Sequence, residues 1–233
     1  FGHMVRQRQI IFELLKQFNK ISITVFHMRN IQVLKKSFGN KIRYVKNFNN
    51  IALCKTPSGL LDISNTKKQF NKWKKKSDQF LKKNSNLLLN FDFFISDLVP
   101  EISYYAYNVK KPCFSVCHYT WDWFFKKIFK KANHNINTLK KYTNLSTKIY
   151  FPPMTHSSKL KNAKNITNVN FVANKILKEK ISNKKIKILI MNNGTEALSS
   201  KIVNIIPELF KLKDYDFYVS TAHLNKNLLD QIK

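Results

Sequence analysis

Several residue types are scarce in this chain, and each shortage narrows what the protein can be. Among 233 residues there are only 3 cysteines. Cys113 and Cys117 lie four apart in a strand-like run, so we expect small core residues without a metal or redox role. No stretch approaches the roughly 18 consecutive apolar residues of a membrane span, and no charged-then-apolar leader is recognised. These shortages predict a soluble, cytoplasmic protein.

Acidic residues are scarce too, since 13 Asp and Glu face 42 Lys and Arg, for a net charge of +29. Such a charge favours nucleic acid or an anionic membrane as partner. The arginines, which read phosphates and bases better than lysine, are few: Arg6, Arg8, Arg29 and Arg43. The lysines accompany abundant Asn, Ile and Phe and only 4 Gly, as in an AT-biased genome. We therefore favour compositional drift over nucleic-acid binding, and attraction to anionic lipid is compatible with both.

Strand-like and helix-like segments alternate along the chain, which is typical of a parallel sheet covered by helices. Strands are predicted over residues 21–27, 42–45, 91–97, 113–117 and 148–151. Helices are predicted over residues 5–18, 31–38, 64–81, 123–129 and 135–145, with a further helix that starts near Pro100 and finishes over 104–108. The third of these is lysine-rich and is capped by Ser64 or Asn65. From residue 155 to 185 the chain is polar and rich in Lys and Asn.

A second unit begins at residue 186 with a strand over 186–191, a turn over 192–195, a helix over 196–210 and a strand over 217–220. We expect an α/β protein: a Rossmann-like domain over 1–175, a linker over 176–185, and the first βαβ unit of a second Rossmann-like domain over 186–233. A lone βαβ unit cannot bury both faces of its sheet. Phe1-Gly2-His3 also enters a helix without a preceding strand, so we expect a fragment truncated at both ends.

Polar residues gather at the predicted carboxyl ends of two strands, the edge where doubly wound folds bind ligands. Asp97 ends one strand, and Pro100 follows at a helix start. His118 ends the next strand and precedes Thr120-Trp121-Asp122-Trp123. Asp97 either binds a ligand or caps the following helix. The same two alternatives apply to Thr120 and Asp122, either of which could cap the helix over 123–129. For Trp121 and Trp123 we favour core packing over a platform for a sugar or lipid.

Three motifs carry a resemblance to a known family. Gly2-His3-Met4-Val5-Arg6 resembles the Gly-His-x-x-Arg turn of GT-B glycosyltransferases, notably the type that makes lipid-linked peptidoglycan precursors. Ser96-Asp97-Leu98-Val99-Pro100, followed by 112–116 and 120–123, resembles the glycosyltransferase-like proteins that include the amino-terminal part of L-arabinokinases. Residues 188–195 are similar to the strand and turn that open the nucleotide-sugar domain. Asn192 and Asn193 stand where that turn usually carries a Gly pair.

The resemblance implies a glycosyltransferase that moves a sugar from a nucleotide-sugar donor to a hydroxyl-bearing acceptor, lipid-linked in the peptidoglycan type. His3 would be the catalytic base, and Asp97 would orient the acceptor or replace His3. The remaining implied contacts are with the acceptor at Gly2, Arg6, His118, Thr120 and Asp122, and with the donor diphosphate at Asn193, Gly194 and Thr195. The family works without a bound metal, and no cofactor is expected beyond the nucleotide-sugar co-substrate. Asp214-Tyr215-Asp216 is discounted as a metal site because it precedes a strand, at the amino edge of the sheet.

Alternative interpretations remain open. Nucleotide-sugar epimerases and hydrolases share this architecture, and fold alone does not determine function. A basic nucleic-acid-binding or scaffold protein would make His3 and Asp97 incidental. Gly-His-Met is also a common remnant of tag removal, in which case Met4 would be the native start. For a lipid-linked acceptor we expect a peripheral location at the inner face of the membrane.

Overall fold

The computed structural model describes residues 2–27, 31–46, 51, 53–56, 60–129, 134–156, 165–170, 186–190, 204–209 and 211–219. The chain separates into two compact units. The first comprises Phe1–Ile51 and Gln69–Lys175, and the second comprises Ala52–Lys68 and Ile176–Lys233. No helix in the described ranges is long and apolar enough to cross a membrane.

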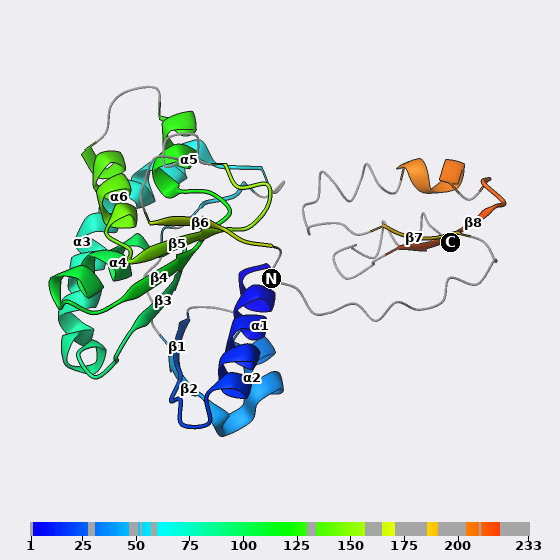
Figure 1. Cartoon of the computed structure of the whole chain (residues 1–233). Helices are drawn as coiled ribbons and strands as arrows, with labels where there is room; N and C mark the ends of the chain where they lie inside the picture. The colour runs from blue at the N-terminus through cyan, green and yellow to red at the C-terminus, as the bar shows by residue number, and fades with distance from the viewer. Residues whose placement is uncertain are drawn as a thin grey trace. The chain divides into compact units, whose positions relative to one another are not determined.

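The strands described in the first unit pair in parallel within two sheets, as Figure 1 shows. The smaller sheet pairs β1 (Thr24–His27) with β2 (Arg43–Lys46). The larger sheet has the order β3-β4-β5-β6. Its strands are β3 (Phe94–Asp97), β4 (Cys113–Val116), β5 (Lys148–Phe151) and β6 (Ile166–Asn168). Because the strands are parallel, their carboxyl ends share one edge, and that edge positions the candidate site.

Helices connect these strands. They are α1 (Gly2–Gln17), α2 (Gln32–Phe38), α3 (Ile63–Leu88), α4 (Pro100–Asn108), α5 (Trp121–Ile128) and α6 (His134–Asn144), with a short 3-10 helix, η1 (Gly39–Lys41). Tyr142 of α6 stacks on Tyr104 of α4 and meets Trp73 of α3 edge-on. The three helices α3, α4 and α6 therefore pack together beside the larger sheet (Figure 1).

Three clusters of buried side chains form the core of the described part. One lies between α1, α2 and β2 and includes Met4, Ile11 and Leu34. A second surrounds the amino ends of β3 and β4. The third is aromatic and joins α3 to α5 and α6, where Phe70 stacks on Phe125 with ring centroids 4.0 Å apart. Burial of these large rings away from water stabilises the unit.

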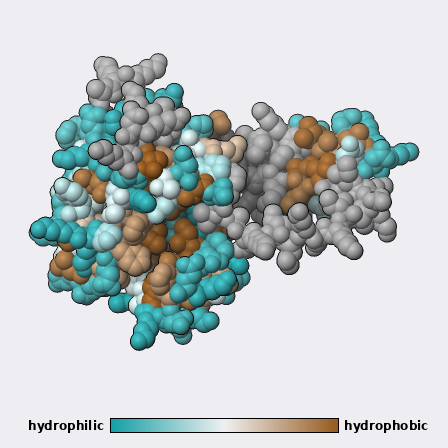
Figure 2. All heavy atoms as spheres, in the orientation of Figure 1, coloured by the Kyte–Doolittle hydropathy of each residue, from teal (hydrophilic) through white to brown (hydrophobic). Residues whose placement is uncertain are grey.

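The second unit contains the parallel pair β7 (Ile186–Ile190) and β8 (Tyr215–Val219), with helical residues at 204–209. Figure 2 shows apolar surface over this pair. The side chains of Leu189 and Tyr218 are 62% and 51% exposed, and Ile205 is 51% exposed. Within the described part of this unit only these two strands pair, and so small a sheet has few neighbours to cover its apolar side chains.

The α/β class and the parallel sheets are confirmed, and β5 has the predicted bounds. Three details differ from the sequence prediction. Strand β6 lies within the polar, Lys- and Asn-rich stretch over 155–185, where the sequence predicts no strand; it forms because β5 supplies it with a partner. Helix α3 is capped by Asp62 instead of Ser64 or Asn65, since Asp62 Oδ1 accepts a 2.9 Å hydrogen bond from the backbone N–H of Asn65. Helix α1 begins at Gly2, so Gly2 and His3 form its first turn instead of a turn before it.

Glu101 is an unusual core residue because its carboxyl group is completely buried in α4. Its Oε1 accepts a long, 3.4 Å hydrogen bond from Ser77, and Oε2 has no hydrogen-bond partner among the described residues. The indole N–H of Trp73 approaches the carboxyl without hydrogen-bond geometry. Burial raises the pKa of Glu101 to about 7, and Trp73 and Ser77 oppose that rise.

This pKa predicts a specific pH dependence of stability. A carboxyl whose folded pKa lies above its unfolded value stabilises the fold when protonated, so its contribution is full below about pH 4.5 and falls as the pH rises through about 7. Between pH 5 and pH 8 the protein should lose up to about 3 kcal/mol from this group. We expect Glu101→Gln to remove that loss in urea unfolding at the two pH values. An unchanged difference would mean that Glu101 is ionised at both.

Candidate active site

Asp97 is the centre of the candidate site, at the carboxyl end of β3. Its Oδ1 accepts a hydrogen bond from Arg6 Nη2, and its Oδ2 accepts bonds from Arg6 Nε at 3.2 Å and Gln7 Nε2 at 2.9 Å. The side chains of Arg6 and Asp97 are only 7% and 10% exposed. A two-point Arg–carboxylate pair at this burial fixes the orientation of the carboxylate. Helix α1 is thereby attached to the edge of the larger sheet.

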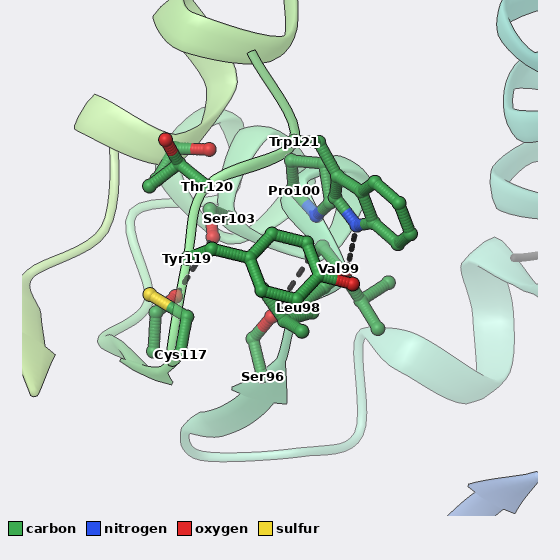
Figure 3. Close-up of a pocket in the computed structure, with 11 residues that line it drawn as sticks. Ser96, Leu98, Val99, Pro100, Ser103, Cys117, Tyr119, Thr120 and Trp121 are labelled. Carbon is green, nitrogen blue, oxygen red and sulfur yellow. Dashed lines mark hydrogen bonds between the residues drawn. The ribbon is translucent and has the colours of Figure 1, made fainter. Parts of the chain in front are cut away.

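The turn after Asp97 is built by its neighbours. Ser96 Oγ donates to the carbonyl of Val99 at 2.9 Å and accepts from the N–H of Val99 at 3.2 Å. Leu98 has φ 61°, the left-handed region that bulky residues avoid. The buried indole N–H of Trp121 donates to the Leu98 carbonyl at 2.8 Å, as Figure 3 shows. Ser96 and Trp121 therefore hold a strained turn that directs Asp97 toward α1.

A small cavity lies behind this turn, lined by residues that include Ser96, Ser103, Ser115, Cys117 and Tyr119 (Figure 3). Its volume is about 10 Å³. That volume accommodates about one water molecule and no sugar. A sugar or an acceptor at this edge would therefore have to bind outside the cavity.

The charges of Arg6 and Asp97 also affect the pKa values of two neighbouring side chains, Tyr119 and Cys117. Burial raises the pKa of Tyr119 to about 12, with an added rise from Asp97 and an opposing effect of Arg6. Burial likewise raises the pKa of Cys117 to about 12. The pKa of Cys113 is raised to about 11 by burial. Both thiols are therefore protonated at neutral pH, and both are buried core residues, which is the position that the sequence predicted.

The residues that follow β4 lie at the same edge. The backbone carbonyl of His118 accepts a 3.0 Å hydrogen bond from the N–H of His156. Thr120 is at the N-cap position of α5 but makes no side-chain cap bond. Asp122 is in the first turn of α5, 3.6 Å from Lys126, with its Oδ1 unpaired among the described residues. Both side chains are buried, since Thr120 and Asp122 are only 2% and 4% exposed.

The two tryptophans of this segment differ. Trp121 is a core residue at 6% exposure, which agrees with the favoured interpretation. Trp123 is half-buried and stacks on the exposed His156, with ring centroids 5.1 Å apart and planes within 7°. His156 also forms a parallel β-bridge with Tyr119 at the carboxyl edge. Spacing alone does not show the stacking contact, because 33 residues separate its two rings.

The structure describes the remaining predicted site residues only in part or not at all. His3 belongs to the first turn of α1, three positions before Arg6 and four before Gln7, so the three positions share one face of the helix. The side chains of Gly2 and His3 lie outside the described part, as do residues Asn193, Gly194 and Thr195 entirely. Asp216 lies near the amino end of β8, where Tyr215 pairs with the first residue of β7. Within the described ranges no group of three His, Cys, Asp or Glu side chains is arranged to hold a metal.

Sequence reasoning missed Gln7 and Tyr119 as members of this site. Gln7 had a usable signal, because it lies four positions after His3 on a helix that also carries Arg6. Tyr119 directly follows His118 at a predicted strand end. It is easily counted as an apolar core residue because of its aromatic ring, although it also carries a polar hydroxyl. No sequence pattern pairs Arg6 with Asp97, which are 91 positions apart.

Comparison with protein-family models and with curated proteins finds no match. Among solved structures, the chain is similar to the structure of Phytolacca americana UGT2 complexed with UDP-2fluoro-glucose and pterostilbene. The identity is 12%, the TM-score is 0.56, and the match covers 100% of this chain and 67% of that chain. At this identity the likeness concerns the fold.

The fold is therefore the Rossmann-like α/β arrangement of the GT-B type, as the sequence predicted. The neighbour that carries this conclusion is a plant UDP-glycosyltransferase. The carboxyl edge with Asp97, Tyr119 and His118 is the edge at which such α/β sheets bind ligands.

Proposed function

We propose that this protein is a glycosyltransferase that transfers a sugar from a nucleotide-sugar donor to a hydroxyl-bearing acceptor. The observation that supports this most strongly is the Asp97 carboxylate, held by Arg6 and Gln7 at the carboxyl edge of a GT-B-type sheet. The strained Leu98 turn adds support, since such strain is concentrated at functional sites. The solved neighbour was crystallised with a UDP-sugar analogue and pterostilbene.

In the proposed reaction His3 is the catalytic base. Its imidazole accepts the proton of the acceptor hydroxyl, the acceptor oxygen bonds to the anomeric carbon, and the bond from that carbon to the diphosphate breaks. Asp97 stabilises the imidazolium that forms and orients the acceptor. The place of His3 in α1 supports a pairing of His3 with Asp97, because His3 shares a helix face with Arg6 and Gln7. Both of these side chains bind Asp97. Arg6 positions Asp97 rather than binding the acceptor directly.

The donor would be bound by the second unit. We assign the diphosphate to Asn193, Gly194 and Thr195, at a predicted helix start whose free N–H groups suit an anion. Residues 1–175 would form the acceptor domain, 176–185 the linker and 186–233 the start of the nucleotide-sugar domain. The assignment includes neither a metal nor a cofactor beyond the donor itself. Gly2, His118, Thr120 and Asp122 complete the acceptor side of the site.

A lipid-linked acceptor would place the protein at the inner face of a membrane. The outer face of α3 supports this extension, because Lys72, Lys75, Lys82 and Lys83 are all exposed there. Near an anionic surface each such lysine contributes about 1 kcal/mol of attraction. The same lysines would also attract nucleic acid, and salt-sensitive binding to duplex DNA tests that alternative.

Ligand-induced stabilisation tests the proposal on the protein encoded by the full reading frame. A nucleotide sugar at about 100 times its dissociation constant stabilises a protein by about 2.7 kcal/mol, which raises the melting temperature by roughly 5 to 10 °C. We expect this rise with at least one of UDP-glucose, UDP-N-acetylglucosamine and GDP-mannose. A flat response to all donors, together with salt-sensitive binding to heparin and duplex DNA, would favour the basic binding protein. Epimerases and hydrolases would also show the rise and are separated by product analysis.

A further inference from the structure

A completely buried carboxyl group follows the turn that holds Asp97. Glu101 is the second residue of α4 and lies four positions after Asp97. It is 0% exposed and contacts α3, where Ser77 Oγ donates a 3.4 Å hydrogen bond to its Oε1. Its Oε2 and the indole N–H of Trp73 have no hydrogen-bond partner among the described residues. Two unpaired polar groups at one buried contact are unusual, because each costs free energy when it is removed from water.

The contact accommodates two protonation states of Glu101. The neutral acid suits the α3 side of the contact, because Trp73 is surrounded by the rings of Phe70 and Tyr142. The ionised carboxylate instead needs donors, and the Ser77 hydroxyl, the Trp73 indole N–H and the backbone N–H of Glu101 are all close to it. The first turn of a helix also favours a negative charge. The observed geometry fits the neutral form, and small side-chain movements satisfy the ionised one.

Other titratable groups around this contact keep one charge state near neutral pH. Those on α4 and on the elements packed against it include Lys74 and Asp78 of α3, Asp97 of β3, Tyr105 of α4, Cys113 of β4 and Tyr142 of α6. Burial raises the pKa values of Tyr105 and Tyr142, and it raises that of Cys113 to about 11. Burial lowers the pKa of Lys74, but Asp78 and Tyr142 outweigh this effect and leave it raised. The pKa of Glu101, which burial raises to about 7, differs from these because it lies in the neutral range.

Hydrogen bonds connect the start of α4 to the turn before it. Ser96 Oγ donates to the carbonyl of Val99 and accepts from its N–H, and Val99 directly precedes α4 (Figure 3). The carbonyl of Leu98 accepts the indole N–H of Trp121 at 2.8 Å. The residues from Ser96 to Glu101 are therefore linked closely, and a displacement of Glu101 reaches the Trp121 hydrogen bond.

We propose that Glu101 is a proton-dependent switch between α3 and the turn over residues 96–99. When Glu101 is neutral, its contact with α3 has the geometry seen in the structure. When it loses its proton to solvent, the carboxylate draws the Ser77 hydroxyl and the Trp73 indole N–H into hydrogen bonds. The first turn of α4 then moves, and the orientation of Asp97 changes with it. This switch does not depend on glycosyl transfer.

NMR of the tryptophan indole groups tests the switch in the full protein, without donor or acceptor. Trp73 reports on the Glu101 carboxyl and Trp121 reports on the carbonyl of Leu98. Their signals are identified by Trp73→Phe and Trp121→Phe. We expect both indole N–H signals to shift between pH 5 and pH 8 with one common midpoint. In Glu101→Gln neither signal should titrate, whereas the Trp123 signal should behave as in the unsubstituted protein.

Three results would overturn the switch. A titration of Trp73 without one of Trp121 would mean that the carboxyl ionises without moving the turn. Constant signals from both would mean that Glu101 keeps one protonation state. The same titration in Glu101→Gln would assign it to another group. Because no substrate is present, these outcomes are independent of whether the protein transfers a sugar.

Ser77→Ala tests the switch in a protein that retains the carboxyl group. The substitution removes one donor to the ionised form, so the common midpoint should rise by about 0.5 to 1 pH unit, the equivalent of one hydrogen bond. Ser85→Ala is the matched control, because the Ser85 hydroxyl donates to the carbonyl of Lys82 on the same helix. It should leave the midpoint unchanged. Equal midpoints in Ser77→Ala and the unsubstituted protein, or equal shifts in both variants, would overturn the proposed mechanism.

Discussion

Asp97→Asn is expected to lower the turnover of glycosyl transfer by about 10²- to 10⁴-fold, the usual contribution of one member of an acid–base pair. The physical reason is the loss of the negative charge that stabilises an imidazolium at His3. His3→Ala should cause a loss of similar size. The double variant should be little worse than either single one, because two groups that act as a unit are not additive.

Steady-state kinetics with a saturating donor measure this effect, and two controls exclude a general loss of structure. His134→Ala removes an exposed histidine of α6 and should retain full turnover. Circular dichroism of Asp97→Asn should retain the helical signal of the unsubstituted protein. Wild-type turnover in Asp97→Asn or His3→Ala would remove that residue from the proposed chemistry.

Arg6→Met is expected to reduce the free energy of unfolding by about 3 to 5 kcal/mol, the cost of leaving one buried charge without its partner. Asp97 is the affected group, since its side chain is only 10% exposed and loses the two hydrogen bonds that it accepts from Arg6. Replacing both partners by apolar residues costs far less, because no charge is then left uncompensated.

A double-mutant cycle in urea checks this prediction. Arg6→Met/Asp97→Leu should recover most of the stability lost by Arg6→Met, while turnover stays low because the carboxylate is absent. Arg8→Met is the matched control: Arg8 is exposed on the same helix, and its loss should change stability by less than about 0.5 kcal/mol. Additive losses at Arg6 and Asp97 would contradict a direct energetic coupling between them.

Much of the fold was predictable because its signals are local. The alternation of short β-rich runs with helical spacing located β1 to β5 and β7, and Pro100 marked the start of α4. Strand β6 was not predicted because its sequence, Ile-Thr-Asn, is only three residues long and lies among lysines and asparagines. Its strand conformation comes from pairing with β5, which is a tertiary effect and has no signature in the segment itself.

The candidate site was only partly predictable for a related reason. The strand-end rule located Asp97 and His118 at one edge, because that rule depends on topology alone. It does not reveal that Arg6 turns inward to pair with Asp97, or that Met154 and His156 line the same edge from β5 onward. Such contacts join residues tens of positions apart and depend on how the helices pack against the sheet.

Product analysis by mass spectrometry tests glycosyl transfer most directly. The full protein is incubated with a stabilising nucleotide sugar and a panel of phenols, alcohols and free sugars as acceptors, and nucleoside diphosphate and each acceptor are quantified together. The account predicts that each diphosphate released is matched by one acceptor molecule heavier by one sugar residue, and that Asp97→Asn abolishes both signals. Diphosphate or free sugar without a glycosylated acceptor, or an epimerised donor, would contradict it and identify a hydrolase or epimerase of the same fold.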